Sequence, residues 1–262
     1  MIDSKKGFLP ISHGIAVSKI QCPSTPDEEA RMSKTPYAFA ICSIMYVMLC
    51  TRPDVATTLY MTSKYQNKPG EGHWTAVKNI LKYLKRNKDM FLVFGGDDKL
   101  VVSGYTNASF QTDRDNSQSQ SGYVFLLYGG AISWKSSKQN TLADSATEAE
   151  YIAASEATKE AVWIWKFVCE LGVIPTISSP IDVYCDNNGA IAQAKEPRSH
   201  KKSKHIERRY HLIREIIDRG DVKICRVPTD ANVADPLTKP LPQSKHERHR
   251  AVIGLRCINE WS

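Results

Sequence analysis

Beyond residue 100 the sequence alternates between short β-rich runs and helical patterns, and this order restricts the possible folds more than any other feature. The runs at 100–106, 122–127 and 131–135 are rich in β-branched and aromatic residues, with turn residues such as Gly129-Gly130 between them. Short strands separated in this way predict a three-stranded antiparallel meander.

A helix follows the meander and begins at a recognisable cap. Ser145-Ala-Thr-Glu148 has the spacing of a capping box and predicts a helix that ends near Leu171. The remaining patterns predict strands at 181–185 and 221–227. They also predict a helical stretch at 190–194, an amphipathic helix at 205–219 and a helical turn at 231–237. We therefore expect an α/β fold, with a mixed five-stranded sheet flanked by helices.

The N-terminal part of the chain has a different character. Residues 1–33 show little periodicity and predict an extended or irregular lead-in, whereas 34–95 has helical patterns. The first helix, at about 35–50, is apolar nearly all round, which predicts a buried helix. A later helix begins after Gly72 and places Trp74, Val77, Leu81 and Leu84 on one face. We place the domain boundary within 87–99, followed by a sheet domain at 100–242 and a tail at 243–262.

Composition fits a soluble globular protein. The 262 residues are 42% hydrophobic and 24% charged, with a formal net charge of +7. The seven cysteines have neither CxxC spacing nor the density of a disulfide scaffold, which indicates thiols in a reducing compartment. The longest apolar run, 37–50, is shorter than the roughly 20 residues that span a bilayer, so we expect no membrane association.

Three acidic residues occupy positions from which their side chains could meet. Glu150 lies in the second turn of the long helix, Asp186 follows a strand, and Asp235 begins the last helical turn. Strand ends and facing helix ends gather at one edge of an α/β sheet. Two Mg²⁺ ions about 3.5–4 Å apart would be matched by four carboxylates. Asn107, at the end of the first strand, stands where the fourth carboxylate would complete a divalent-metal nuclease site.

Each acid also has a simpler interpretation on its own. Asp186 could cap the following helix, Glu150 could be an exposed helix residue, and Asp235 could be an N-cap. Their joint order and setting favour the shared site.

Eight motifs in a fixed order give this sequence a specific resemblance over 100–242. It resembles the ribonuclease H domain of copia-type LTR retrotransposon Pol polyproteins at Tyr105-Thr-Asn-Ala-Ser109, Ser121-Gly-Tyr-Val124, Gly130-Ala-Ile-Ser-Trp134, Ala146-Thr-Glu-Ala-Glu-Tyr151, Tyr184-Cys-Asp-Asn187, Ser203-Lys-His-Ile206, Tyr210-His-Leu-Ile-Arg-Glu215 and Ala234-Asp-Pro-Leu-Thr-Lys239.

Residues 7–99 resemble the thumb-side end of the reverse transcriptase of the same family. The matching stretches include Pro36-Tyr-Ala, Cys42-Ser-Ile-Met-Tyr46, Thr51-Arg-Pro-Asp54 and His73-Trp74. The resemblance thus implies a small, mostly helical thumb-like region before a ribonuclease H-like domain. The polymerase hairpin Tyr-x-Asp-Asp does not occur in the sequence, so we do not expect polymerase activity from this chain.

The resemblance implies hydrolysis of the RNA strand of RNA–DNA hybrids with two Mg²⁺ or Mn²⁺ ions as cofactors. Carried over position by position, the catalytic and metal-binding residues are Asn107, Glu150, Asp186 and Asp235, with aspartate expected at 107. The expected aspartate bridges both ions, whereas the asparagine amide is neutral and offers a single oxygen. We therefore expect a weak or inactive nuclease. A catalytically silent nucleic-acid-binding or scaffolding domain and a non-functional retroelement remnant are the alternatives.

The expected partners are an RNA–DNA hybrid or another nucleic acid duplex, and the remainder of the Pol polyprotein. Two basic clusters could contact the phosphates of a duplex, although each could also be a solvated surface. Their residues are Lys78, Lys82, Lys85 and Arg86 on the later helix, and Arg198, Lys201, Lys202, Lys204, Arg208 and Arg209 in the second cluster. By resemblance, the expected location is cytoplasmic virus-like particles and the nucleus.

Overall fold

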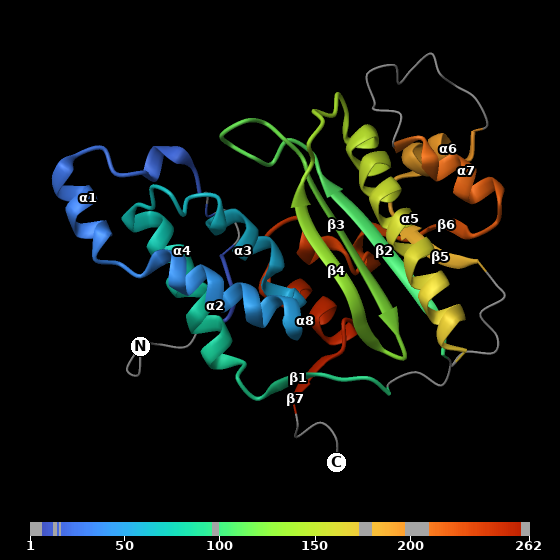
Figure 1. The fold of residues 1–262 in the computed structure, drawn as a ribbon, viewed down its shortest axis with the longest axis horizontal. Coiled ribbons are helices and arrows are strands. Elements are labelled where there is room, and N and C mark those ends of the chain that lie inside the picture. Colours follow the sequence, from blue (N-terminus) through green and yellow to red (C-terminus); the bar gives the residue numbers. More distant parts are fainter. Residues whose placement is uncertain are drawn as a thin grey trace.

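A five-stranded sheet with the order β4-β3-β2-β5-β6 forms the centre of the computed structural model (Figure 1). The structure describes residues 7–12, 15, 17–95, 100–172, 180–196 and 210–257. Strands β2, β3 and β4 form an antiparallel meander, whereas β5 is parallel to β2 and β6 is parallel to β5. The expected α/β fold, a mixed five-stranded sheet flanked by helices, is confirmed. The strands are Val102–Ser109 (β2), Gln120–Leu127 (β3), Gly130–Lys138 (β4), Ile181–Cys185 (β5) and Val222–Arg226 (β6).

The first strand of this sheet is longer than the sequence predicts. β2 continues through position 107, where Asn107 pairs with Gly122, and ends at Ser109, which pairs with Gln120. The polar residues at its end have low strand propensity and therefore resemble a turn. The equally polar start of β3 provides their hydrogen-bonding partners, so the strand does not end where the prediction placed its turn.

One face of the sheet is covered by α5 (Ala146–Leu171), together with α6 (Asn188–Lys195) and α7 (Leu212–Asp218). Ser145 caps α5 as predicted, because its Oγ accepts a hydrogen bond from the Glu148 N–H at 3.2 Å. The Glu148 carboxylate accepts from the Asp144 N–H at 2.8 Å. Small residues let α5 approach the sheet closely, and its buried alanines are Ala149, Ala153, Ala154, Ala157 and Ala161.

The N-terminal region is helical and lies beside the opposite face of the sheet (Figure 1). Within 1–33, expected to be irregular, the described residues include α1. Its capping box is formed by Thr25 and Glu28, with Pro26 in the first turn. The elements of this region are η1 (Lys19–Gln21), α1 (Pro26–Ser33), α2 (Tyr37–Cys50), η2 (Pro53–Val55), α3 (Ala56–Ser63) and α4 (Glu71–Arg86).

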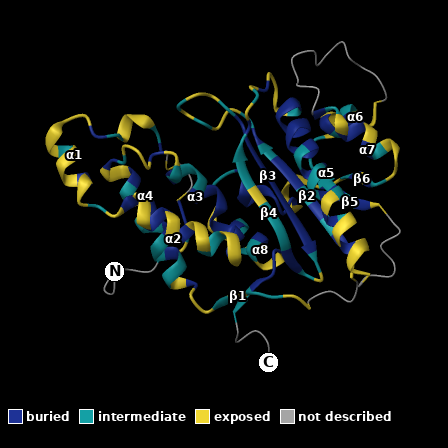
Figure 2. Ribbon diagram, in the orientation of Figure 1, coloured by how far each residue is buried: buried dark blue, intermediate teal, exposed yellow. Residues whose placement is uncertain are grey.

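Helix α2 is only half buried, so the prediction of a buried helix is wrong. Ile41 and Ile44 face α3 and α4, whereas Phe39, Tyr46 and Leu49 are 75%, 73% and 63% exposed. Figure 2 shows exposed stretches along α2. An all-apolar sequence does not reveal which face has a neighbour. No single described helix is long and apolar enough to cross a membrane, although α1 and α2 together, bent by 49°, pass that test.

The buried face of α4 is rotated from the one that the sequence predicts. Val77 is buried as expected, but Trp74, Leu81 and Leu84 are only partly buried. His73 and Tyr83 are fully buried instead. Their polar atoms have partners, since His73 Nδ1 accepts from the Gly70 N–H at 2.9 Å and Tyr83 donates to Asp54. A polar side chain can lie in a core when its hydrogen bonds are made there.

The C-terminal segment, expected to be a tail, is part of the fold. After η4 (Thr229–Ala231) and η5 (Asp235–Leu237) it forms α8 (Gln243–Val252) and β7 (Leu255–Cys257). Strand β7 pairs antiparallel with β1 (Met90–Leu92). All five strands of the central sheet lie between these two strands along the chain. On the second face of the sheet, residues from both sides of the expected domain boundary form one hydrophobic core: Ala56, Val124, Leu126, Ala131, Val233, Ala234, Leu237 and Ile253.

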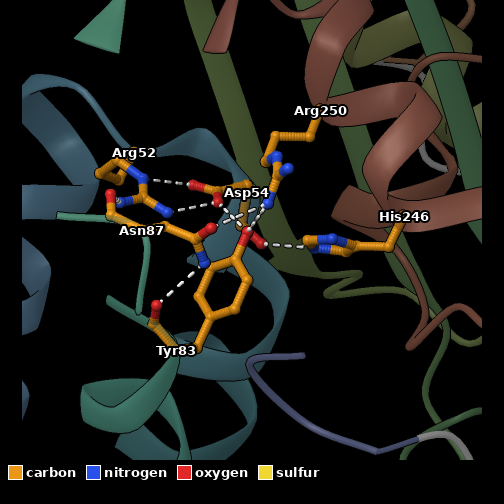
Figure 3. Close-up of polar contacts among 6 residues, drawn as sticks. All are labelled: Arg52, Asp54, Tyr83, Asn87, His246 and Arg250. Carbon is orange, nitrogen blue, oxygen red and sulfur yellow. Dashed lines mark hydrogen bonds and ion pairs between the residues drawn. The ribbon is translucent and has the colours of Figure 1, made fainter. Parts of the chain in front are cut away.

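A buried polar cluster joins the N-terminal helices to α8 (Figure 3). Asp54 accepts hydrogen bonds from the Arg52 Nε and Nη2 at 2.9 and 2.7 Å. Arg250 of α8 donates to the Asn87 Oδ1 at 3.2 Å, and His246 Nε2 lies 3.4 Å from the Asp54 carbonyl oxygen. Burial opposes the charge on Asp54, but Arg52, and to a lesser extent His246 and Tyr83, hold its pKa below the usual range. This cluster fixes α8 against the helical region.

We expect Asp54→Asn to destabilise the protein by about 3–5 kcal/mol, because it leaves the buried Arg52 guanidinium without a counter-charge. The matched control is Glu29→Gln in the exposed Lys68–Glu29 pair, which should cost less than about 1 kcal/mol. Urea unfolding of both variants measures the difference. Equal effects would show that the cluster contributes no more than a surface ion pair.

We expect stability to fall as the pH drops from about 6.5 towards 4, partly because of His249 on α8. Burial lowers the pKa of His249 to about 4, from an ordinary value of 6.5. In this pH window the unfolded chain binds a proton that the folded chain does not, so protonation favours unfolding. Between pH 6.5 and 4, the unfolding free energy of His249→Gln should therefore fall by about 1–2 kcal/mol less than that of the unmodified chain. An unchanged slope would contradict this assignment.

Candidate functional site

Asn107 is buried, and its side chain points to the segment that follows the last strand of the central sheet. Its Nδ2 donates to the Asp235 Oδ1 at 2.6 Å and to the Thr238 Oγ1 at 3.0 Å. Gly122, its partner on β3, allows this approach, since a Cβ there would lie 2.8 Å from the Leu237 Cβ and 2.9 Å from the Thr238 Cγ2. Asn107 and Asp235 are therefore in direct contact although 128 positions separate them.

Asp235 is fully buried and carries two cationic partners. Lys239 Nζ lies 3.0 Å from its Oδ1, and Lys245 Nζ lies 2.7 Å from its Oδ2. The loop that holds Asp235 is attached to β2 by Asn232, whose Nδ2 donates to the Thr106 carbonyl at 3.0 Å. A carboxylate out of contact with water requires such neutralisation.

Glu150 is 6% exposed and lies beside two other acids. Burial raises its pKa to about 8; the Ala108 N–H opposes this rise, while the nearby charges of Asp186 and Asp235 add to it. Its Oε2 is buried without a hydrogen-bond partner. Other buried carboxylate oxygens in the described residues also have no hydrogen-bond partner, but this one lies next to a second acid, Asp186, where one ligand could bind both.

Potential ligand atoms of Glu150, Cys185 and Asp186 lie within 4.8 Å of one another. Burial raises the pKa of the Cys185 thiol to about 12, so this thiol stays protonated near neutral pH. Hard divalent cations prefer oxygen ligands. One such cation would therefore be held by Glu150 and Asp186.

The simpler interpretations of the three acids do not hold. Asn187, rather than Asp186, caps α6, because its Oδ1 accepts from the Ala190 N–H at 2.9 Å. Glu150 is buried, and Asp235 lies in the first turn of η5, whose N-cap is Ala234. The structure thus brings all four sequence-predicted site positions to one place, around β2, the start of α5 and η5.

The residues present fit one divalent cation better than two. Glu150 Oε2 and Asp235 Oδ2 are both buried without a hydrogen-bond partner, but each oxygen of Asp235 lies within ion-pair distance of an ammonium group. Asn107 adds a neutral amide whose NH₂ group points at Asp235. A second cation at Asn107 and Asp235 would have to displace these groups.

Of the predicted nucleic-acid-binding residues, four lie on α4. Lys78, Lys82 and Lys85 are partly buried, and the Arg86 guanidinium stacks on Phe8 at 3.8 Å. Helix α4 packs on α2 and α3, while α3 lies against β4. The second basic cluster falls outside the described residues: Arg198, Lys201, Lys202, Lys204, Arg208 and Arg209.

Sequence reasoning missed three side chains of the site: Thr238, Lys239 and Lys245. Lys239 follows Asp235 at a spacing of four residues, which is a usable signal for an ion pair. Lys245 has no such signal, because its contact depends on how α8 packs.

No protein-family model matches the chain. It is 42% identical over 255 residues to the Retrovirus-related Pol polyprotein from transposon TNT 1-94 of Nicotiana tabacum, covering 97% of this chain and 19% of that protein. It is 34% identical over 221 residues to the Pol polyprotein from transposon RE2 of Arabidopsis thaliana, covering 84% and 15%. Secreted RxLR effector protein 161 of Plasmopara viticola is 45% identical over 135 residues, covering 51% of this chain and 94% of that protein. The chain thus spans less than a fifth of the two polyproteins.

Among solved structures, LC11-RNase H1 from compost matches 53% of this chain and 94% of its own, with 18% identity and a TM-score of 0.40. The foamy viral protease-reverse transcriptase in complex with double-stranded DNA matches 78% of this chain and 35% of its own, with 12% identity and a TM-score of 0.47. The extent and identity of the sequence matches carry the assignment: this chain belongs to the family of copia-type retrotransposon Pol polyproteins.

Proposed function

We propose that this chain is a ribonuclease H-type module that binds RNA–DNA hybrids, and that Asn107 strongly impairs its cleavage of the RNA strand. The observation that carries the proposal is the meeting of Asn107, Glu150, Asp186 and Asp235 around one buried position. Membership of the Pol family supports the same activity.

The site residues have distinct roles in this proposal. Glu150 and Asp186 would hold a Mg²⁺ or Mn²⁺ ion, since their oxygens lie close together and Glu150 Oε2 is unpartnered. When bound, such an ion activates water and stabilises the leaving oxygen in phosphodiester hydrolysis. Asn107 fixes the position of Asp235 but brings no negative charge to the site.

The impairment follows from charge. An aspartate at 107 would place a second carboxylate against Asp235 and create strong attraction for a cation between them. The amide instead satisfies Asp235 by hydrogen bonding, and Lys239 and Lys245 neutralise what remains. Without a shared anionic ligand, the two-metal arrangement implied by the resemblance is not supported.

The second candidate function is a nucleic-acid-binding or scaffolding domain without catalysis. The ion pairs of Asp235 favour this second function, because one of the expected metal-binding carboxylates already contacts Lys239 and Lys245 instead of a cation. In both cases the basic residues of α4 and of the cluster at 198–209 would contact phosphates. The remainder of the Pol polyprotein is the proposed protein partner, with cytoplasmic particles and the nucleus as proposed locations.

We expect Asn107→Asp to raise the rate of hybrid cleavage in Mg²⁺ by at least about 100-fold, the scale of one electrostatic contribution in an active site. The matched control is Asn67→Asp, which adds the same charge at an exposed position away from the site. Cleavage of a labelled RNA–DNA duplex measures the rates, with Asn107→Asp/Glu150→Gln to show that any gain uses this site. A high rate in the unmodified chain, unchanged by Asn107→Asp, would refute the impairment.

We expect Lys78→Gln/Lys82→Gln to weaken hybrid binding. The magnitude of the slope of the logarithm of the association constant against the logarithm of the salt concentration should fall by about one to two, because each phosphate contact contributes about 0.9. The control, Lys34→Gln/Lys68→Gln, removes the same charge from positions at the end of α1 and after α3. Fluorescence anisotropy at several salt concentrations measures both slopes. Identical slopes in the two double variants would remove α4 from the proposed duplex surface.

A further inference from the structure

Lys245 reaches the candidate site from α8, an element outside the central sheet. Its Nζ lies 2.7 Å from the Asp235 Oδ2 and 3.2 Å from the Asp230 Oδ1. Its side chain is 19% exposed, whereas that of Lys239 is 38% exposed. Lys245 is therefore the more constrained of the two cations at Asp235.

The position of Lys245 depends on contacts made by its neighbours on α8. His246 and Arg250 enter the polar cluster around Asp54, Tyr83 and Asn87 (Figure 3). Beyond the helix, the Ile253 carbonyl accepts from the Ala131 N–H at 2.9 Å, which attaches the end of α8 to β4. Helix α8 is thus held from both the helical region and the sheet, and so is its lysine.

The charges around the site are unevenly distributed. Both oxygens of Asp235 face ammonium groups, and Asn107 donates a further hydrogen bond to one of them. Glu150 Oε2 and Asp235 Oδ2 are both buried without a hydrogen-bond partner, but Asp235 Oδ2 has the Lys245 ammonium beside it, whereas Glu150 has the Asp186 carboxyl group as its neighbour. A divalent cation at Asp235 would therefore meet two positive charges at close range, whereas one at Glu150 and Asp186 would lie between two carboxyl groups.

We propose that Lys239 and Lys245 fill the cation position at Asp235, so that this site binds one divalent cation, at Glu150 and Asp186, and that Lys245 is a positioning residue for Asp235. The inference rests on the proposed function in one respect, namely that Asn107, Glu150, Asp186 and Asp235 form a metal-binding site. It differs from the arrangement implied by the family resemblance, in which two ions share the ligand at 107.

Binding of Mn²⁺ to the full chain without nucleic acid tests the inference. Electron paramagnetic resonance counts the ions bound by the unmodified chain, by Lys245→Met and by Lys245→Arg, which keeps the charge. We expect one Mn²⁺ in the unmodified chain and in Lys245→Arg. In Lys245→Met the binding of a second ion should tighten by at least about tenfold, because one competing unit charge is removed.

Two further variants make the result decisive. Glu150→Gln should lose the single Mn²⁺ of the unmodified chain, and Asn107→Asp/Lys245→Met should bind two ions. Lys245→Gln replaces Lys245→Met if the latter fails to unfold cooperatively. Two ions in the unmodified chain, or no change in affinity on removal of the lysine charge, would overturn the inference. The experiment measures neither hybrid binding nor cleavage. The number of bound ions can therefore be interpreted even if the proposed function is wrong, and a wrong ion count would not by itself refute the proposed function.

Discussion

The burial of the Asp235 carboxylate is the constraint on which the arrangement of this molecule depends. A charge without access to water is stable only if partners surround it. Here they come from three parts of the chain: Asn107 on β2, Lys239 in the following turn and Lys245 on α8. Meeting this requirement brings the sheet, η5 and the C-terminal helix together at one point.

The central sheet could be predicted from the sequence because strand patterns and the Ser145 cap depend on nearby residues. The grouping of Asn107, Glu150, Asp186 and Asp235 has no local signal and could be predicted from the order of the elements and from the family resemblance. The exposed side of α2 could not be predicted in this way, because Phe39 and Ile41 are both apolar and only packing distinguishes them. The role of Lys245 was hidden for the same reason.

The helical region and the sheet do not behave as separate bodies in this structure. Ala56 of α3 shares a hydrophobic core with Val124 of β3 and Ile253 after α8. Thr57 also donates to the Pro236 carbonyl at 2.7 Å, within the turn that presents Asp235. Residues outside the central sheet therefore support the geometry of the candidate site. Changes in α3 or η2 can reach that site without touching its residues.

The pairing of β1 with β7 has a consequence for how the chain is held together. Residues 90–92 and 255–257 are joined by backbone hydrogen bonds, and the shared core lies beside them. The two regions are therefore held together by non-covalent contacts in addition to the covalent link between β1 and β2.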